Sequence, residues 1–450
     1  MEKQMKAIIF SSAKHFIVTL TAAFIGLLSI GCQSTQAPTG ELTQVGPTPI
    51  STAISVAQPT SRPLSTAADT ISSQPQPTVI TLTVWATEGF TPQSDLVAEQ
   101  LSNFETDNPN VKVKIHLKNS SGQASALNYL RSAKEVAPGV LPDLVILDTG
   151  DLPYAWRENL IQPLNDKLDR TIVQDLLPAA LKLGAVDGQL AGMPFELDLE
   201  HLVYNTTLIT DTPLLWTDVL SSGVSYQFPA KGRAKQLGDA SLSHYVSAGA
   251  RLVNEEGAAK VDEAALLDTL NFYQHALEQE IINADILNVS ESYEQWEQFL
   301  SGEIGMTHVS AHRYLTDRRM LSNARPGAIP SAKGAPVAIG HGWVFALVTS
   351  DPARQKHALK LIETFMQTDV NANWATRSAV IPTRQSAFYL VANDDPYWLF
   401  LSNYLQAAIP QPAFEGFDQL SRALQQAVEQ VINKEASPDK AVQNAVADLE

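Results

Sequence analysis

The sequence predicts an α/β fold with a parallel sheet, and two observations support this prediction. From residue 79 onward, stretches with strand-like hydrophobic patterns alternate with amphipathic helical stretches, an order typical of parallel sheets covered by helices. The chain has 450 residues, of which 44% are hydrophobic. Because this length is too great for one ordinary domain, we expect about two to three domain-sized units or two interleaved lobes.

The first 32 residues are predicted to be an export signal. Lysines precede an apolar run from Phe16 to Ile30, which is shorter than a comfortable bilayer span and has the layout of a secretory signal. The run ends at Ser29-Ile30-Gly31-Cys32. This motif resembles a bacterial lipobox, although the Leu usual at the third position before the cysteine is Ser29 here. The resemblance implies that Cys32 is lipidated and anchors the protein to the cell membrane. The alternative is a secreted protein with an unmodified thiol, and under either reading the mature protein works outside the cytoplasm.

Residues 33–78 have a different composition, rich in Pro, Ser, Thr and Gln and without aromatic residues. Such a segment cannot bury enough apolar surface to offset the entropy of ordering it. We therefore predict a disordered, flexible tether that lets an anchored body sample a volume above the membrane.

The folded part begins with three predicted strands. Residues 79–85 and 111–117 alternate between apolar and polar side chains, and residues 143–147 form a continuous apolar run that is typical of a strand covered on both faces. A helical pattern lies between the first two strands, with Ser94 or Asp95 as its N-cap.

Candidate binding residues follow two of these strands. Trp85 and Glu88 come at the end of the first strand, and Asp148 follows the third. Ligands of parallel sheets gather beyond the carboxyl ends of the strands, so we expect these side chains to lie near a ligand.

The alternation continues in the second half of the chain. Residues 201–204 and 342–348 have strand patterns, whereas residues 266–281 and 352–365 have helical ones, the last opened by Asp351-Pro352. Two further helical stretches follow residue 420, and no internal repeat or heptad run is found.

Charge and cysteine content exclude several classes of function. Lys and Arg number 31 against 48 Asp and Glu, which gives a formal net charge of −17. A nucleic-acid partner is not expected, because this charge repels phosphate backbones. The single cysteine, Cys32, excludes an intramolecular disulfide and a Cys-based zinc cluster.

Four stretches, taken in order, resemble a known family. They are residues 142–164, 187–205, 213–220 and 299–306, and residues 337–370 add a strand and a helix that match as well. The folded part is similar to the extracellular solute-binding proteins of family 1, the maltose-binding-like components of bacterial ABC importers. Each motif is loose alone, but five in the same order and spacing are specific, and the resemblance covers nearly all of the chain after the tether.

The resemblance implies a two-lobe, periplasmic-binding-protein-like (type II) fold with three interlobe crossings and the ligand in the cleft. Residues 79–195 and 325–368 would form the first lobe, and residues 199–322 and 372–450 the second. A solute that touches both lobes favours the closed form, which the permease subunits of the importer recognise. The expected solute is a carbohydrate, either an oligosaccharide or a polyol, and the protein is expected to be a monomer without cofactor or enzymatic activity.

A cleft for carbohydrate needs aromatic rings for sugar C–H faces, together with carboxylates and amides for hydroxyl groups. By the family motif, Asp198 occupies the position of a ligand-contacting acid on the first crossing, and Asp148 and Asp151 lie in the loop of a second acidic contact. His312 and Tyr314 stand where the family often places the aromatic residues that floor the pocket. A histidine is smaller and titratable, so either the stacking floor is weaker or the ligand differs from a malto-oligosaccharide.

Trp85, Phe195 and Trp343 are further aromatic candidates from the first lobe. Each candidate also has a structural interpretation, which the sequence leaves open. The two tryptophans end apolar strands and would suit the core, as would Phe195. Asp198 would suit a hinge salt bridge, and Asp148 would suit the cap of a turn.

Other functions have weaker support. The sequence contains no G-x-S-x-G elbow, H-E-x-x-H motif, P-loop or dinucleotide fingerprint, although a glycosidase needs no fixed spacing between its two carboxylates. His308 and His312 would meet on one helix face and offer two metal ligands, without an adjacent run of carboxylates. A ligand-sensing module of a sensor or adhesion system and an importer component for a non-sugar solute stay open. Arg313, Arg377 and Arg384 are the basic residues that would favour an anionic solute.

Overall fold

The computed structural model describes residues 79–87 and 94–449. The chain divides into two units, Met1–Ser72 and Ser73–Glu450, and every described residue belongs to the second. The predicted signal with Cys32, the predicted tether and Glu88 therefore lie outside the described residues. Within the described part of the chain, no helix is both long enough and apolar enough to cross a membrane.

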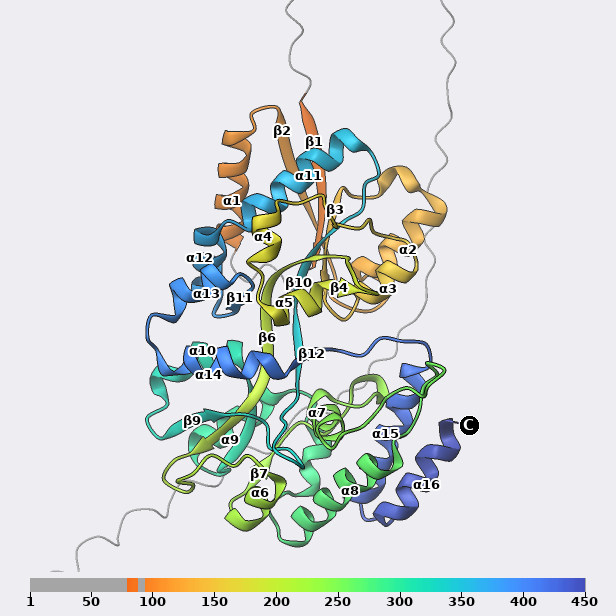
Figure 1. The fold of residues 1–450 in the computed structure, drawn as a ribbon, viewed down its shortest axis with the longest axis vertical. Helices are drawn as coiled ribbons and strands as arrows, with labels where there is room; N and C mark the ends of the chain where they lie inside the picture. Colours follow the sequence, from red (N-terminus) through yellow and green to blue (C-terminus); the bar gives the residue numbers. More distant parts are fainter. Residues whose placement is uncertain (1–78, 88–93, 450) are drawn as a thin grey trace, which may run out of the picture. The chain divides into compact units, whose positions relative to one another are not determined.

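The first lobe is built on a mixed sheet with the strand order β2-β1-β3-β10-β6 (Figure 1). The bounds are β1 (Ile80–Thr87), β2 (Val111–Lys118), β3 (Leu144–Asp148), β10 (Ala338–Leu347) and β6 (Met193–Asn205). The three strands predicted at the start of the folded part are present, and β1 runs parallel to both β2 and β3. The prediction of a parallel sheet holds for these strands alone, since β10 runs antiparallel to β3 and β6 as it returns from the second lobe.

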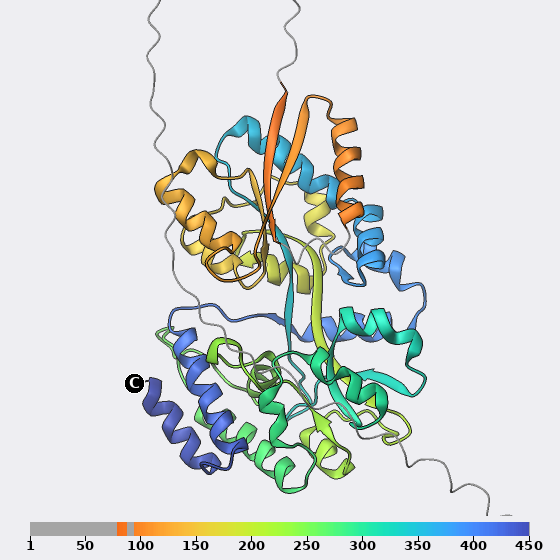
Figure 2. The same cartoon turned by 180° about the vertical axis from the view of Figure 1, so that it is seen from behind.

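Helices cover both faces of this sheet, with α1 and α11 on one side and α2 and α3 on the other (Figures 1 and 2). The helices of this lobe are α1 (Ser94–Asp107), α2 (Ala126–Val136), α3 (Leu152–Arg157), α4 (Arg170–Gln174), α5 (Pro178–Gly184), α11 (Pro352–Phe365), α12 (Thr368–Ser378) and α13 (Gln385–Ala392). Its short elements are η2 (Pro138–Val140), β4 (Ala185–Val186), β5 (Gln189–Leu190) and β11 (Ile381–Pro382).

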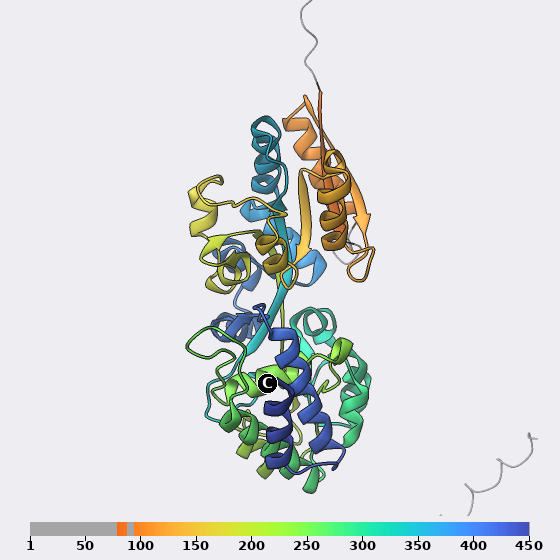
Figure 3. The ribbon, with the colours of Figure 1, turned by 90° about the vertical axis from the view of Figure 1, so that its right-hand side faces the viewer.

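The second lobe has a smaller sheet, β6-β8-β7, with β9 paired to β6. Its strands are β7 (Tyr226–Gln227), β8 (Met306–Ser310) and β9 (Ala324–Gly327). Its helices are α6 (Trp216–Ser222), α7 (Asp239–Ser247), α8 (Glu263–Glu278), α9 (Trp296–Ser301), α10 (Ala311–Asp317), α15 (Phe417–Ile432) and α16 (Pro438–Leu449), and its 3-10 helices are η3 (Arg233–Lys235), η4 (Ala284–Asn288), η5 (Ser292–Gln295) and η6 (Arg318–Met320). Helices α15 and α16 lie side by side and pack on α8 around one apolar core (Figures 1 and 3).

Three segments cross between the lobes, as predicted. The first is β6, whose residues from Met193 to Leu199 pair with β10 and from Glu200 onward with β8, so that one strand serves both sheets. The second is β10, and the third is the chain between α13 and α14 (Pro396–Tyr404), because α14 packs in the second lobe, where Tyr397 stacks on Tyr314. After η7 (Leu405–Ala407), β12 (Ala408–Pro410) pairs with the start of β10. Figures 1 and 2 show β6 and β10 running together from one lobe into the other.

The limits predicted for the lobes differ from those of the structure at two crossings. Residues 325–337 pack with the second lobe, because β9 pairs with β6 and Ser331 bridges to Leu215 there. Residues 372–392 lie with the first lobe, where Trp374 packs in the same core as Phe195. The second and third crossings therefore come later in the sequence than predicted.

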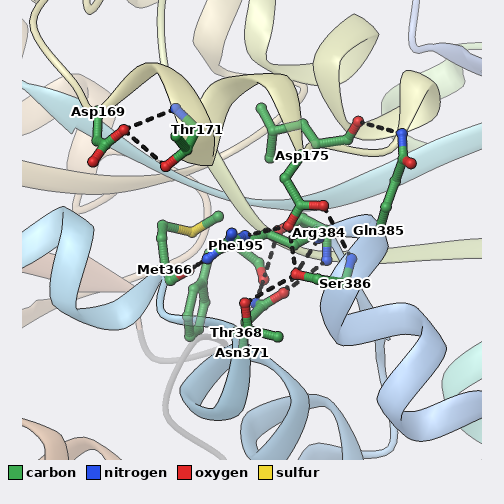
Figure 4. Close-up of polar contacts among 12 residues, drawn as sticks. Asp169, Thr171, Asp175, Phe195, Met366, Thr368, Asn371, Arg384, Gln385 and Ser386 are labelled. Atoms are coloured by element: carbon green, nitrogen blue, oxygen red, sulfur yellow. Dashed lines mark hydrogen bonds and ion pairs between the residues drawn. The ribbon is translucent and has the colours of Figure 1, made fainter.

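A polar clamp explains why residues 372–392 stay with the first lobe (Figure 4). Asp175, which follows α4, accepts hydrogen bonds from Arg384 Nε at 2.7 Å and from Ser386 Oγ at 2.5 Å. Fully buried Asn371 donates to the carbonyl of Phe195 at 2.8 Å and accepts from Thr383 N at 3.1 Å. Three of these contacts join residues that are 176 to 211 positions apart, which hydrophobic periodicity does not reveal.

Removing the carboxylate of this clamp is expected to destabilise the protein. Asp175→Asn leaves the Arg384 guanidinium, whose side chain is 12% exposed, without its counter-charge. The free energy of unfolding should fall by about 2 kcal/mol, allowing for partial solvent screening, as measured by urea denaturation. Asp166→Asn is the control, because its ion pair with Arg170 is more than 80% exposed on both sides and contributes little. Equal unfolding midpoints for both variants would contradict this account of the clamp.

A candidate ligand-binding cleft between the lobes

A cleft of about 870 Å³ is lined by residues from both lobes and from the crossing strands. This volume is within the range of sites that bind small molecules. Its lining includes Ser121, Asp148, Asp151, Tyr154, Asp198, Glu200, Arg233, Asp239, Glu291, Tyr293, His312, His341, Trp343 and Phe417.

The structure brings together five of the residues that the sequence singled out. Asp148, Asp151, Asp198, His312 and Trp343 all line the cleft. Asp148 and Trp343 are opposite each other on β3 and β10, and Asp198 is opposite His341 on the crossing strands. Asp148 at the end of β3 and Trp343 in the middle of β10 are thus neighbours at the cleft wall.

Two of these carboxylates also have structural partners. Asp148 Oδ1 accepts a hydrogen bond from Gly150 N at 2.7 Å, so it caps a turn while facing the cleft. Asp198 Oδ1 accepts from the backbone N–H groups of Leu199 at 2.9 Å and His312 at 3.1 Å. This second contact ties β6 to the first turn of α10, at the junction between crossing and second lobe.

Trp85 and Phe195 lie in the first-lobe core instead of the cleft. Trp85 is 6% exposed and packs edge-on against Tyr129. Phe195 is completely buried, with its ring 4.7 Å from that of Trp374. Because side chains alternate along a strand, Asp198 and Glu200 lie on the face of β6 opposite to Phe195, and both line the cleft. The predicted strand, 201–204, was too short to reveal this alternation.

Tyr314 lies away from the cleft as well. Its ring stacks on Tyr397 at 4.3 Å and borders a separate hollow. His312, two residues earlier, does line the cleft, and its Nδ1 donates toward the carbonyls of Ser378 at 3.1 Å and Ala379 at 3.2 Å. The family position that carries an aromatic floor is therefore occupied by an imidazole that contacts the first lobe.

Burial raises the pKa of three carboxylates in the cleft. It raises the pKa of Asp151 to about 6, with a further contribution from the nearby Asp148 carboxylate. Burial also raises the pKa of Asp198, and it raises that of Glu200 to about 7. The charges and hydrogen bonds of the protein thus do not fully replace the water that these carboxylates lose on burial, as is common at binding sites.

The cleft also contains a cation that sequence reasoning missed. His341 Nε2 lies 2.7 Å from Asp239 Oδ2. Burial alone would lower the pKa of His341, but the Asp239 carboxylate outweighs it and raises the pKa to about 10. His341 is therefore protonated at neutral pH. The two residues are 102 positions apart, so no local pattern relates them.

Several other residues that line the cleft were missed in the sequence analysis. One of them could have been found from its strand pattern, whereas others lie in segments without such a pattern. Glu200 lies two positions after Asp198 on β6 and therefore on the same face of the strand, so extending the predicted strand back to residue 193 would have found it. Arg233 and Glu291, which form an ion pair, and Tyr293 come from 3-10 helices and the loops beside them. Irregular segments of this kind carry no hydrophobic period.

Of the three arginines that would favour an anionic solute, one lies at the cleft and two lie elsewhere. Arg313 borders the cleft and pairs with Asp317 at 2.7 Å. Arg384 belongs to the clamp with Asp175, and Arg377 lies 3.5 Å from Glu99 on α1. Neither of the latter two lines the cleft.

The two histidines considered for a metal do not share a helix face. His308 is on β8, where its Nε2 lies 2.6 Å from the Tyr226 hydroxyl, whereas His312 is on α10. Ser310 separates them as the N-cap of that helix. No group of three or more His, Cys, Asp or Glu residues in the described ranges is arranged to hold a metal ion.

The comparisons with known proteins agree with this architecture. A family model for bacterial extracellular solute-binding proteins matches residues 99–397. The chain belongs to this family, as the sequence resemblance predicted. The family consists of proteins that bind solutes without catalysing a reaction, and membership implies a location outside the cytoplasm. No curated protein sequence matches the chain.

Solved structures share the fold at low sequence identity. The sugar-binding protein MalE of Xanthomonas citri superposes with a TM-score of 0.69 at 21% identity, over 82% of this chain and 95% of MalE. Maltose-bound MalE3 of T. maritima gives 0.66 at 18%, over 82% and 99%. A solute-binding protein of Thermotoga lettingae bound with α-D-tagatose gives 0.65 at 17%, over 82% and 98%. The predicted two-lobe, type II fold is confirmed.

The His341–Asp239 pair predicts a dependence of stability on pH. The pKa of His341 is about 10 in the folded protein against an ordinary value of 6.5. Its stabilising contribution is therefore complete below pH 6.5 and is lost as the pH rises through 10. His341→Gln should lower the free energy of unfolding by about 1 to 2 kcal/mol near pH 6, after allowing for the exposed part of the pair, and by little near pH 10.

Chemical denaturation at pH 6, 8 and 10 measures this difference. Exposed His116 on β2 provides the control, since His116→Gln should change stability little at any of these pH values. A His341→Gln effect that is the same size at all three would show that the ion pair is not its source.

Proposed function

We propose that this protein captures a carbohydrate, either an oligosaccharide or a polyol, in the interlobe cleft and delivers it to the permease of an ABC importer. The observation that carries the proposal is the composition of the cleft wall. The Trp343 and Tyr154 rings lie in the same cleft as the Asp148, Asp198 and Glu200 carboxylates. Aromatic faces suit the C–H faces of sugars, and carboxylates suit their hydroxyl groups.

The arrangement of the wall supports capture by closure of the lobes. Asp148 belongs to the first lobe, Asp198 and Trp343 to the crossing strands, and Tyr293 to the second lobe. A solute that contacts all three regions has more contacts when the lobes approach, so it shifts the population toward the closed form. The permease would recognise that form, and the solute would be released unchanged.

Solved relatives add support for the solute class. Those named above are described as bound with maltose, as bound with α-D-tagatose or as sugar-binding. At identities of 21% or less they do not identify the solute here, but neutral polyhydroxyl compounds are the class that this cleft suits best.

The attachment to the membrane is part of the same proposal. Cys32, lipidated before the signal is cleaved, would anchor the protein to the outer face of the cell membrane, and residues 33–78 would tether a monomeric binding unit to that anchor. The length of this tether lets the cleft reach a permease without detachment.

Thermal denaturation with candidate solutes tests the proposal. We expect at least one neutral sugar or polyol, among mono- to tetrasaccharides, to raise the melting temperature of the full-length protein. At 100 times its dissociation constant a solute stabilises by about 2.7 kcal/mol. Stabilisation by an amino acid or an inorganic anion, and by no sugar or polyol, would contradict the carbohydrate assignment.

A matched pair of tryptophan variants localises the binding. Trp343→Ala should weaken the binding of that sugar at least tenfold, because the residue lines the cleft. A tenfold loss of affinity corresponds to about 1.4 kcal/mol of binding free energy. Trp85→Phe should leave affinity unchanged, since Trp85 is buried away from the cleft. Titration calorimetry measures both, and equal losses in the two variants would remove Trp343 from the site.

A further inference from the structure

A buried chain of polar side chains leads from the cleft into the second-lobe core. It begins at Glu200, whose side chain is 22% exposed at the cleft wall. It continues through His308 to Tyr226 at 2.6 Å, to His244 at 3.1 Å, and to Tyr273 at 2.9 Å. The last four residues are completely buried. Two neutral histidines and two tyrosines in an apolar core are costly unless each is hydrogen-bonded in a consistent direction.

Two buried polar atoms face each other where this chain meets the cleft. Glu200 Oε2 and His308 Nδ1 are 3.5 Å apart. Neither atom has a hydrogen-bond partner within the described structure. Glu200 on β6 pairs with Ser310, and His308 is two residues from Ser310 on β8, so the two side chains are diagonal neighbours on one face of the sheet.

When Glu200 is ionised, the available hydrogens allow only one direction of donation along this chain of hydrogen-bonded side chains. Burial lowers the pKa of His308 to about 3 and that of His244 well below its usual value, so each ring is neutral and carries one N–H. Facing a carboxylate, His308 must carry this hydrogen on Nδ1, and its Nε2 then accepts from the Tyr226 hydroxyl. The Tyr226 oxygen accepts from His244 Nε2–H, and His244 Nδ1 accepts from Tyr273. Every donor then points toward Glu200.

We propose that the Glu200 carboxylate binds a hydroxyl group of the carbohydrate, and that the chain from His308 to Tyr273 positions this carboxylate for that contact. The inference rests on the proposed function and adds a requirement for specificity: the solute must present a hydrogen-bond donor at this part of the wall. His308 acts through Glu200 and does not line the cleft, so it is a positioning residue.

The charged and polar surroundings of Glu200 give the contact a pH dependence. They comprise Asp198 on β6, His308 on β8, His341 on β10, Asp239 on α7, Arg233 on η3 and Ser292 on η5. Burial raises the pKa of Glu200 from 4.5 to about 7; the Asp239 carboxylate adds to the rise, whereas Ser292, His341 and Arg233 oppose it. A hydroxyl that donates to the carboxylate favours its ionised form, so binding releases protons near neutral pH and affinity rises from pH 6 to pH 8.

Glu196 provides a matched control on the same strand. Burial raises its pKa to about 7 as well, but its Oε2 accepts from Trp374 Nε1 at 2.6 Å and it does not line the cleft. The two glutamates thus differ in whether they face the solute.

Titration calorimetry on the full-length protein tests the contact, with the panel sugar that gives the largest thermal shift as probe. Glu200→Gln should bind this sugar about tenfold more weakly at pH 8, and the deficit should shrink at pH 6. Glu196→Gln should match the wild type at both pH values. Wild-type affinity in Glu200→Gln at pH 8 would overturn the inference and leave the proposed function intact. Failure of every panel sugar to bind the wild type would instead overturn the proposed function and the hydroxyl contact with it.

The positioning role is tested without any solute, by NMR of the protein labelled with ¹⁵N-histidine. His308 should carry its hydrogen on Nδ1 at pH 8. In Tyr226→Phe, which keeps the ring and removes the hydroxyl, His308 is expected to populate both neutral forms, and the pH midpoint of sugar binding should move upward because a bare Nδ1 disfavours the carboxylate. Observation of the hydrogen on Nε2 in the wild type at pH 8 would overturn the positioning role, even if the variant does not fold.

Discussion

The pairing of β6 with β10 is the constraint on which the rest of the structure depends. One thirteen-residue strand contributes to both sheets, and its hydrogen bonds to β10 hold two of the three crossings together. The backbones are so close here that a Cβ on Gly342 would overlap the carbonyl of Glu196, and the register shifts by a bulge at Trp343. These paired crossing strands form a hinge, which can bend while the lobes on each side keep their own structure.

The same pairing determines which side chains reach the cleft. Alternation along β6 sends Phe195 to the core and Asp198 and Glu200 to the cleft wall, and β10 places His341 and Trp343 beside them. Carboxylates are thus held on backbone that is fixed by ladder hydrogen bonds, in surroundings that raise the pKa of Asp198 and Glu200. Because these side chains are held in place before binding, less entropy is lost when a solute binds.

The sequence predicted the features that depend on periodicity and on family motifs. The first three strands and the helix N-capped at Asp351 follow from local patterns, and Asp148, Asp151 and Asp198 at the cleft follow from strand ends and the family motif. Features set by contacts between distant segments were not predictable in this way. The Asp175 clamp places the third crossing later in the sequence than predicted. Trp85 and Tyr314 pack against Tyr129 and Tyr397, away from the cleft. The chain behind Glu200 is built from four separate segments, so no local signal marks it.

The central claim is that the lobes close on an unmodified sugar, and a distance between their rims tests it most directly. Ser121 in the first lobe and Tyr293 in the second both line the cleft, and Cys32 is the single native cysteine. Fluorophores attached at Ser121→Cys and Tyr293→Cys, in a Cys32→Ser background, report this distance by energy transfer. Transfer should increase when the stabilising sugar is added and should return on its removal, with the sugar recovered intact. Unchanged transfer at saturating sugar, or recovery of a cleaved sugar, would contradict the account.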